Sequence, residues 1–143
     1  MEITYKKSRK LSEDAKTIRE KVFVEEQGFV TEFDEIDHSA VHLTFYENGN
    51  CIAVCRYYRE KDTGDYSIGR IAVIKEYRGK NVGQYMLKVA EKLIREDGGS
   101  NVALSAQVRI KAFYEKLGYQ ETGEIYMDEY CEHICMKKEL EGA

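Results

Sequence analysis

The chain of 143 residues has no proline, no apolar run long enough to cross a membrane and no excess of positive charge. Without proline, repeats or low-complexity tracts, no boundary divides it, and one domain over residues 1–143 is expected. The absence of an apolar leader or span predicts a cytoplasmic protein with no membrane partner. Its 22 basic and 26 acidic residues give a net charge of −4, which argues against a nucleic-acid partner.

Four cysteines form two pairs, Cys51 with Cys55 and Cys131 with Cys135, and His133 lies inside the second pair. Both pairs fall in strand-like patterns, where positions i and i+4 are roughly 13 Å apart, so the two thiols of a pair do not ligate one metal ion. We therefore expect buried free thiols in a reducing compartment and no metal cofactor.

Hydrophobic periodicity predicts strands that alternate with helices. A helix capped by Ser12 is expected to end before Gly28, and the acidic segment 26–40 is expected to be a loop. Two further helices are expected at 82–97 and 110–117. The expected strands lie at 2–7, 41–47, 51–59, 67–74, 102–106, 119–126 and 132–138. This order predicts a mixed α/β sheet with helices on its faces, in which strands 67–74 and 102–106 are parallel.

The most informative segment is the basic turn Arg78-Gly79-Lys80-Asn81-Val82-Gly83, between strand 67–74 and the helix that follows. Such a junction presents free backbone N–H groups and the positive end of a helix dipole at one point, which suits a phosphate or pyrophosphate. The turn matches neither a Walker A loop nor a G-x-G-x-x-G fingerprint. From the residues alone, an anion site and an ordinary solvated basic turn both remain open.

Two motifs resemble those of the GNAT superfamily of acyl-CoA-dependent N-acyltransferases. The segment G-R-I-A-V-I-K-E-Y-R-G-K-N-V-G-Q-Y-M-L (69–87) is similar to the family's pyrophosphate motif R/Q-x-x-G-x-G/A, and A-F-Y-E-K-L-G-Y (112–119) to its second CoA-contacting helix. Segments 18–28, 105–107 and 132–136 look like a small bacterial group that includes the glyphosate N-acetyltransferases. The resemblance implies the GNAT fold, a mostly antiparallel mixed sheet of six or seven strands with a splayed parallel pair, flanked by helices.

The resemblance also implies acetyl-CoA as the acyl donor. The backbone of strand 67–74 would pair with the pantetheine arm, and amides of the basic turn would hold the pyrophosphate. Asn81 stands where the family usually has glycine, but asparagine tolerates positive φ, so altered rather than lost CoA affinity is expected. The implied cofactor-binding residues are Ile71, Ala72, Val73, Arg78, Gly79, Lys80, Asn81, Val82, Gly83, Gln84 and Tyr114.

Transfer to an amine requires the amine to lose a proton and the departing thiolate to gain one. By resemblance Tyr114 is the general acid and His133 the base, although Tyr114 could be a core residue and His133 could only orient the substrate. The implied substrate-binding residues are Arg19, Arg70, Gln107 and His133. Gln107 replaces an arginine of the glyphosate enzymes, which disfavours a strongly anionic acceptor.

The surroundings of the acceptor are less defined. Five aromatic residues are candidates for either the pocket wall or the core: Phe23, Phe29, Phe33, Tyr126 and Tyr130. The acidic run 32–37 could attract a cationic amine or be a solvated loop. The expected activity is direct acetylation of a small-molecule primary amine in a ternary complex. The sequence does not fix the oligomeric state, and a homodimer is compatible with the resemblance only because many family members dimerise. A protein N-acetyltransferase and a non-catalytic acyl-CoA-binding regulatory module are the alternatives.

Overall fold

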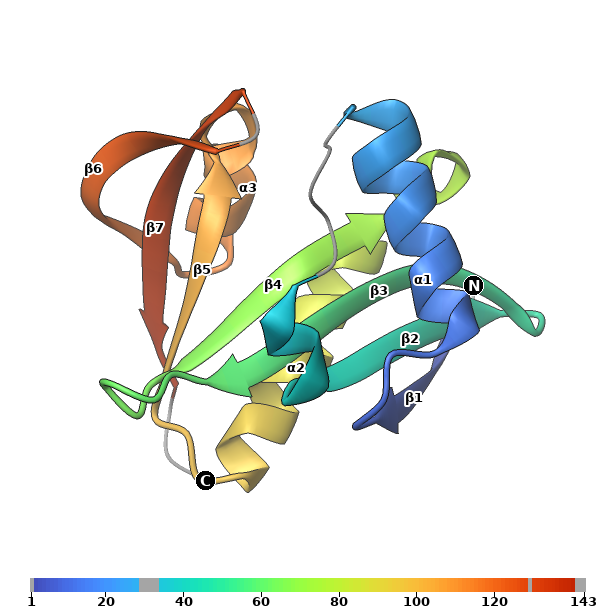
Figure 1. The fold of residues 1–143 in the computed structure, drawn as a ribbon, viewed down its shortest axis with the longest axis horizontal. Coiled ribbons are helices and arrows are strands. Elements are labelled where there is room, and N and C mark those ends of the chain that lie inside the picture. Colours follow the sequence, from blue (N-terminus) through green and yellow to red (C-terminus); the bar gives the residue numbers. More distant parts are fainter. Residues whose placement is uncertain (1, 29–33, 129, 141–143) are drawn as a thin grey trace.

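The computed structural model of the protein describes residues 2–28, 34–128 and 130–140. A seven-stranded sheet in the order β1-β2-β3-β4-β5-β7-β6 forms its centre (Figure 1). Only β4 and β5 are parallel among the described pairs, which confirms the expected mixed sheet. The strands are β1 Thr4–Ser8, β2 Val41–Glu47, β3 Asn50–Arg59, β4 Tyr66–Val73, β5 Asn101–Gln107, β6 Gln120–Asp128 and β7 Cys131–Glu139.

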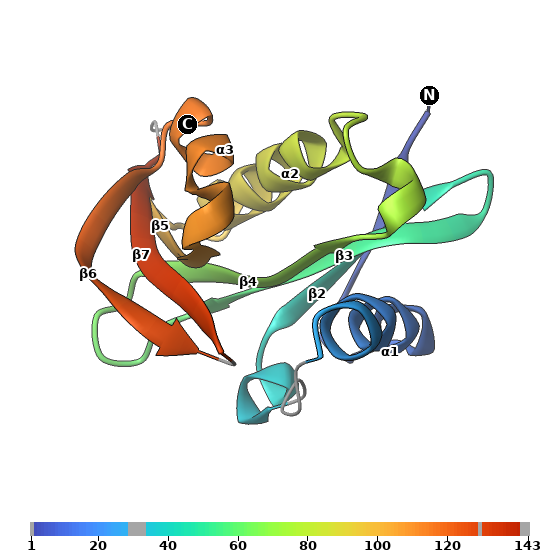
Figure 2. The same ribbon diagram turned by 90° about the horizontal axis from the view of Figure 1, so that it is seen from above.

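Helices cover both faces of the sheet. Helix α1 (Glu13–Arg19) lies on one face, and α2 (Val82–Glu96) and α3 (Lys111–Lys116) lie on the other (Figure 2). The Ser12 side chain accepts from the Ala15 N–H at 3.1 Å and so caps α1 as expected. The apolar stripe of α2 fills the larger core, while α1 packs against Val54 and Ala72 in a smaller one. No helix of the described part is long and apolar enough to span a membrane.

The first helix ends before Gly28 as expected, but after Arg19 it continues as a π-helix, η1 (Glu20–Glu26), with the Gln27 N–H bonded to the Val22 carbonyl. One expectation for the segment 12–40 requires correction. The acidic segment is not wholly a loop, since a 3₁₀ helix, η2 (Glu35–His38), begins after Asp34. Asp34 and Asp37 form a capping box there, which satisfies backbone groups that a loop would leave to water. Residues 29–33, including Phe29 and Phe33, lie outside the described part.

The parallel pair separates soon after it begins. Strands β4 and β5 are paired only at Tyr66 with Val102 and at Ser67 with Ala103. Beyond these pairs β5 stays bonded to β7 along its whole length, and β4 stays bonded to β3. Figure 1 shows β5 leaving β4 at an angle. The sheet therefore opens as a V between β4 and β5, as the resemblance implied.

Candidate active site

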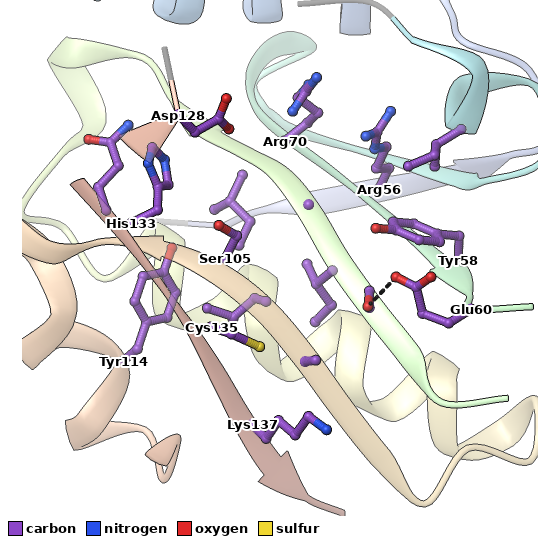
Figure 3. Close-up of a pocket in the computed structure, with 18 of the residues that line it drawn as sticks. Arg56, Tyr58, Glu60, Arg70, Ser105, Tyr114, Asp128, His133, Cys135 and Lys137 are labelled. Carbon is purple, nitrogen blue, oxygen red and sulfur yellow. Dashed lines mark hydrogen bonds between the residues drawn. The ribbon is translucent and has the colours of Figure 1, made fainter. Parts of the chain in front are cut away.

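A cavity of about 720 Å³ occupies the opening between β4 and β5 (Figure 3). Its walls come from strands β3 to β7, from the π-helix and from the segment that leads into α3. The polar side chains among its lining residues include Gln27, Asp34, Arg56, Tyr58, Glu60, Thr63, Asp65, Ser67, Arg70, Ser105, Gln107, Arg109, Tyr114, Tyr126, Asp128, His133 and Lys137. The volume is typical of sites for small organic ligands.

Arg70 reaches this cavity through a bulge in β4. Between the pairs Val54–Ala72 and Arg56–Gly69, one residue of β3 faces two residues of β4. Arg70 takes the left-handed conformation there, with φ 47°. A non-glycine residue held at positive φ is uncommon, and such bulges redirect side chains next to functional sites. The predicted substrate-binding residue Arg70 therefore lies on the cavity wall.

A buried ionic cluster supports the same wall. Arg19 binds Asp37 with two contacts of 2.7 and 3.0 Å, and Arg56 reaches Asp37 at 2.8 Å and Asp34 at 2.6 Å. Arg70 contacts Asp34 at 3.3 Å. Burial alone acts to raise the pKa of Asp37, but the bonds from Arg19 and Arg56 hold it well below its ordinary value. The bond from Arg56 likewise lowers the pKa of Asp34.

Arg19 belongs to this cluster and not to the cavity wall. It is only 1% exposed, and the cavity-lining residues of the described chain do not include it. The structure thus places the predicted substrate contact Arg19 behind Asp37, where it supports the wall that Arg56 and Arg70 form.

Tyr114 enters the cavity from α3. Its side chain is 5% exposed and packs edge-to-face on Phe113 and Tyr119. Burial raises the pKa of its phenol to about 12, so the hydroxyl stays protonated at neutral pH. Figure 3 shows this hydroxyl directed into the cavity. Tyr114 can therefore donate a proton or a hydrogen bond there.

His133 faces the cavity from β7 and is 6% exposed. Its Nδ1 lies 3.0 Å from the Cys131 carbonyl oxygen, and a carbonyl only accepts, so Nδ1 carries the proton. In the neutral form of the ring, the lone pair is then on Nε2, which can accept a proton. The neighbouring register position on β5 is Gln107, whose amide bonds Gln27 of the segment after η1 at 3.0 Å.

The basic turn has the geometry of an anion site. Gly79 and Asn81 have φ of 78° and 65°, so Asn81 adopts the left-handed conformation that the sequence analysis expected of it. No side chain caps α2, and the N–H groups of Val82, Gly83 and Gln84 therefore remain available to a ligand. A Cβ at Gly83 would lie 3.3 Å from Phe113, which explains the small residue at that position.

Arg78 has a different environment from the one expected. Its Nε donates to the Val73 carbonyl at 2.9 Å, and its two terminal nitrogens bind Glu26 at 2.8 and 2.9 Å. The ion pair lowers the pKa of Glu26. The side chain thus ties the π-helix to the end of β4, while its backbone remains part of the turn.

Several cavity residues were not predicted from the sequence, among them Arg56, Tyr58, Ser105, Asp128 and Lys137, whereas Asp34 belongs to the acidic run that was a candidate for attracting a cationic amine. Arg56 carried a usable signal, since it is a charge within the apolar run of β3. Of the five candidate wall aromatics, Phe23 and Tyr126 line the cavity, whereas Tyr130 is 88% exposed and is not among the lining residues of the described chain.

Comparison with known proteins agrees with this geometry. The family model described as an acetyltransferase (GNAT) domain matches residues 8–140. The uncharacterized N-acetyltransferase YjcF of Bacillus subtilis (strain 168) is 32% identical over 97% of this chain and 100% of its own. The crystal structure of Escherichia coli ElaA superposes with a TM-score of 0.81 at 27% identity, covering 96% of this chain and 99% of the other.

A further crystal structure, of a Lactobacillus plantarum protein, superposes with a TM-score of 0.87 at 26% identity over 98% of this chain and 99% of the other. The chain therefore belongs to the GNAT acetyltransferase family and is an N-acetyltransferase. An acyl-CoA donor follows from this membership.

Proposed function

We propose that the protein transfers the acetyl group of acetyl-CoA directly to the primary amine of a small molecule. One observation carries the proposal: Tyr114 and His133 come from separate elements, α3 and β7, and both face the cavity that the splayed strands open. A proton donor and a proton acceptor therefore share one cavity, as acyl transfer to an amine requires.

The residues present fit an acyl-CoA. Beyond Ser67, the edge of β4 that faces β5 has no strand partner among the described residues, so Ile71 and the N–H of Val73 offer backbone groups to a pantetheine arm, whereas Ala72 between them pairs with Val54 of β3. The uncapped amides of Val82, Gly83 and Gln84 suit a pyrophosphate, with Lys80 beside them. The bound donor supplies a thioester whose acyl carbon the amine attacks and whose thiolate leaves.

The protein's own groups move the protons. His133 Nε2 accepts a proton from the ammonium of the acceptor and makes it nucleophilic, because Nδ1 is already committed to the Cys131 carbonyl. Tyr114 donates to the departing thiolate, and its raised pKa of about 12 keeps the hydroxyl protonated for this task. Neither step forms a bond between the enzyme and the acyl group.

The acceptor is a small polar amine, such as an amino acid. Arg70 offers a guanidinium to it, and the Nε–H of Arg56 is buried with no acceptor among the described residues. Gln107 in place of an arginine disfavours a strongly anionic acceptor of the glyphosate type. A peptide acceptor is the second candidate, since Glu60 and Lys137 extend the cavity away from His133.

Thermal unfolding with acetyl-CoA, together with thiol release over a panel of free amino acids, amino sugars, diamines and short peptides, tests the proposal. At a hundredfold excess over its dissociation constant, a donor that binds only the folded state stabilises it by about 3 kcal/mol. We expect this stabilisation and thiol release with one class of small amine. Thiol release with peptides alone would favour a peptide acceptor. No stabilisation by acetyl-CoA would contradict the proposed donor site.

Tyr114→Phe separates catalysis from binding. It removes the hydroxyl and keeps the buried ring, so the thermal shift with acetyl-CoA is expected to persist while the transfer rate falls by about 10²- to 10⁴-fold. Tyr130→Phe is the matched control, because the Tyr130 side chain is 88% exposed. An unchanged transfer rate in Tyr114→Phe would exclude Tyr114 as the acid. Loss of acetyl-CoA binding in this variant would instead mean that Tyr114 serves to bind the donor.

A further inference from the structure

The hairpin of β6 and β7 is irregular beside His133. Thr122 lies opposite Cys135, but Tyr126 lies opposite His133, so the three residues Gly123 to Ile125 face the single residue Ile134. In an unbroken ladder, the residue opposite His133 would be Glu124. Bulges next to active sites redirect side chains, and this bulge brings an aromatic ring to His133 in place of a carboxylate.

Tyr126 makes two contacts that link three strands. Its ring stacks on the His133 imidazole, with centroids 5.9 Å apart and planes 27° from parallel. Its hydroxyl is hydrogen-bonded to the Ser105 hydroxyl on β5, although β7 lies between β5 and β6. The phenol therefore reaches across β7 from His133 to Ser105, and all three side chains face the cavity.

The imidazole needs more than one contact to be fixed. Rotation of a histidine ring about χ2 is broad, and the bond from Nδ1 to the Cys131 carbonyl is a single constraint on it. A ring stacked on one face restricts the swing about that bond, and the Ser105 hydroxyl in turn fixes the tyrosine. Together these contacts determine where Nε2 points.

We propose that Tyr126 is a positioning residue for His133, anchored by Ser105, and that the β6 bulge exists to place it. The inference rests on the proposed role of His133 as base, but the position and tautomer of the imidazole can be tested without knowing the acceptor. It assigns the stacked tyrosine and the serine hydroxyl to one unit that holds the imidazole in its Nδ1–H form, with Nε2 toward the cavity.

Nitrogen-15 NMR of the imidazoles tests this unit without any substrate. The chain has three histidines, so the signals of His133 are assigned by their loss in His133→Gln. We expect the Nδ1–H tautomer for His133 in the wild type and a mixture of tautomers in Tyr126→Leu. Tyr126→Phe and Ser105→Ala should give equal intermediate effects, because each removes the same hydrogen bond, and their combination should add nothing. Tyr130→Phe, in the same hairpin, should match the wild type.

Kinetics with the amine that the panel identifies provide the second readout. Loss of the stacked ring is expected to lower kcat by about 10- to 100-fold with little change in the KM for acetyl-CoA, since misplacement of a catalytic group by about 1 Å has this effect. If Tyr126→Leu fails to fold, Tyr126→Phe and Ser105→Ala still test the anchor.

The outcomes are distinguishable. A wild-type tautomer population in Tyr126→Leu, or in both Tyr126→Phe and Ser105→Ala, would overturn the inference. A changed tautomer population with an unchanged kcat would support the positioning of the ring by Tyr126 and would instead remove the role of base from His133. Failure of acetyl-CoA to bind would affect the proposed function alone.

Discussion

Asn81 makes the basic turn possible with a residue other than glycine. Its φ of 65° places it in the left-handed region, where asparagine is among the best tolerated side chains. The conformation matters because it lets the chain enter α2 without a side-chain cap, so that the first amides of the helix remain open. One residue thus sets the backbone conformation on which the proposed pyrophosphate site depends.

Asn81→Ala is expected to destabilise the protein by about 1 kcal/mol, because alanine is disfavoured in the left-handed region, and to weaken acetyl-CoA binding as the turn relaxes. Asn81→Gly should stay within about 0.5 kcal/mol of the wild type and bind at least as tightly, since glycine allows the conformation and removes a side chain from the phosphate path. Urea unfolding and calorimetric titration with acetyl-CoA measure both effects. An alanine variant that equals the glycine variant in both would refute this account.

The surroundings of Arg19 could not be predicted from the sequence. A sequence gives the apolar period of a helix and the alternation of a strand, but the carboxylate that neutralises Arg19 lies 18 residues away in the segment expected to be a loop. The resemblance placed Arg19 toward the substrate, whereas folding places it behind Asp37. The opposite holds for Tyr114 and His133, which short motifs identified and which the fold brings to one cavity.

At the scale of elements, the short helix η2 is bonded to α1, β2, β3 and β4 beside the cavity. Asp34 and Asp37 at its start bind arginines from α1, β3 and β4, and the Asp37 carbonyl contacts the His42 ring on β2 at 2.9 Å. A helix of four residues has almost no stability of its own, so these ionic contacts hold it in place. Disruption of the ionic cluster should therefore also displace η2 from the cavity wall.

Asp37→Asn tests this dependence. It leaves Arg19 and Arg56 buried beside a neutral group, and breaking a buried ion pair in this way destabilises by about 3–5 kcal/mol. Asp62→Asn, in the exposed turn between β3 and β4, is the control and should change little. Urea unfolding at neutral pH measures both. A loss below about 1 kcal/mol would mean that the cluster is not what holds η2.

Low pH should destabilise the protein through protonation of the Asp37 carboxylate. The folded pKa of Asp37 is lowered, so its contribution to stability is present above the ordinary value near 3.8 and is lost as the pH falls below it. The wild-type free energy of unfolding should therefore decrease below about pH 4, and that of Asp37→Asn should decrease less steeply. Equal slopes in chemical denaturation between pH 4 and 2 would contradict the assignment.

The order of the elements was more predictable than their irregularities. Alternating strands and a strand–helix–strand unit give the mixed sheet and the parallel pair, because period and connection handedness are local properties. The π-helix, the bulge at Arg70 and the bulge before Tyr126 were not predicted, since each shifts hydrogen bonds by one or two residues without changing the residue pattern. The positions of several cavity-lining side chains depend on these irregularities. The residues of the cavity wall were therefore predicted less well than Tyr114 and His133, which lie in short motifs.

At the scale of the whole molecule, the larger of the two cores buries several groups that ionise only in alkali. Burial raises the pKa of the Cys55 thiol to about 12 and that of the Tyr114 phenol to about 12, and it also raises the pKa values of Tyr57 and Tyr119. Because these groups titrate at lower pH in the unfolded chain, the unfolded state releases protons first and is favoured as the pH rises.

The free energy of unfolding should therefore fall from about pH 9 upward, first through Cys55, whose ordinary pKa is 9.0, and then through the tyrosines, whose ordinary value is 10.0. Each buried group adds up to about 1.4 kcal/mol per pH unit between its unfolded and folded pKa. Cys55→Ala should reduce the slope between pH 9 and 11, and Tyr114→Phe should reduce it above pH 10. Tyr130→Phe is the surface control, because that side chain is 88% exposed. If Cys55→Ala combined with Tyr114→Phe kept the wild-type slope, the loss of stability in alkali would have its cause outside this core.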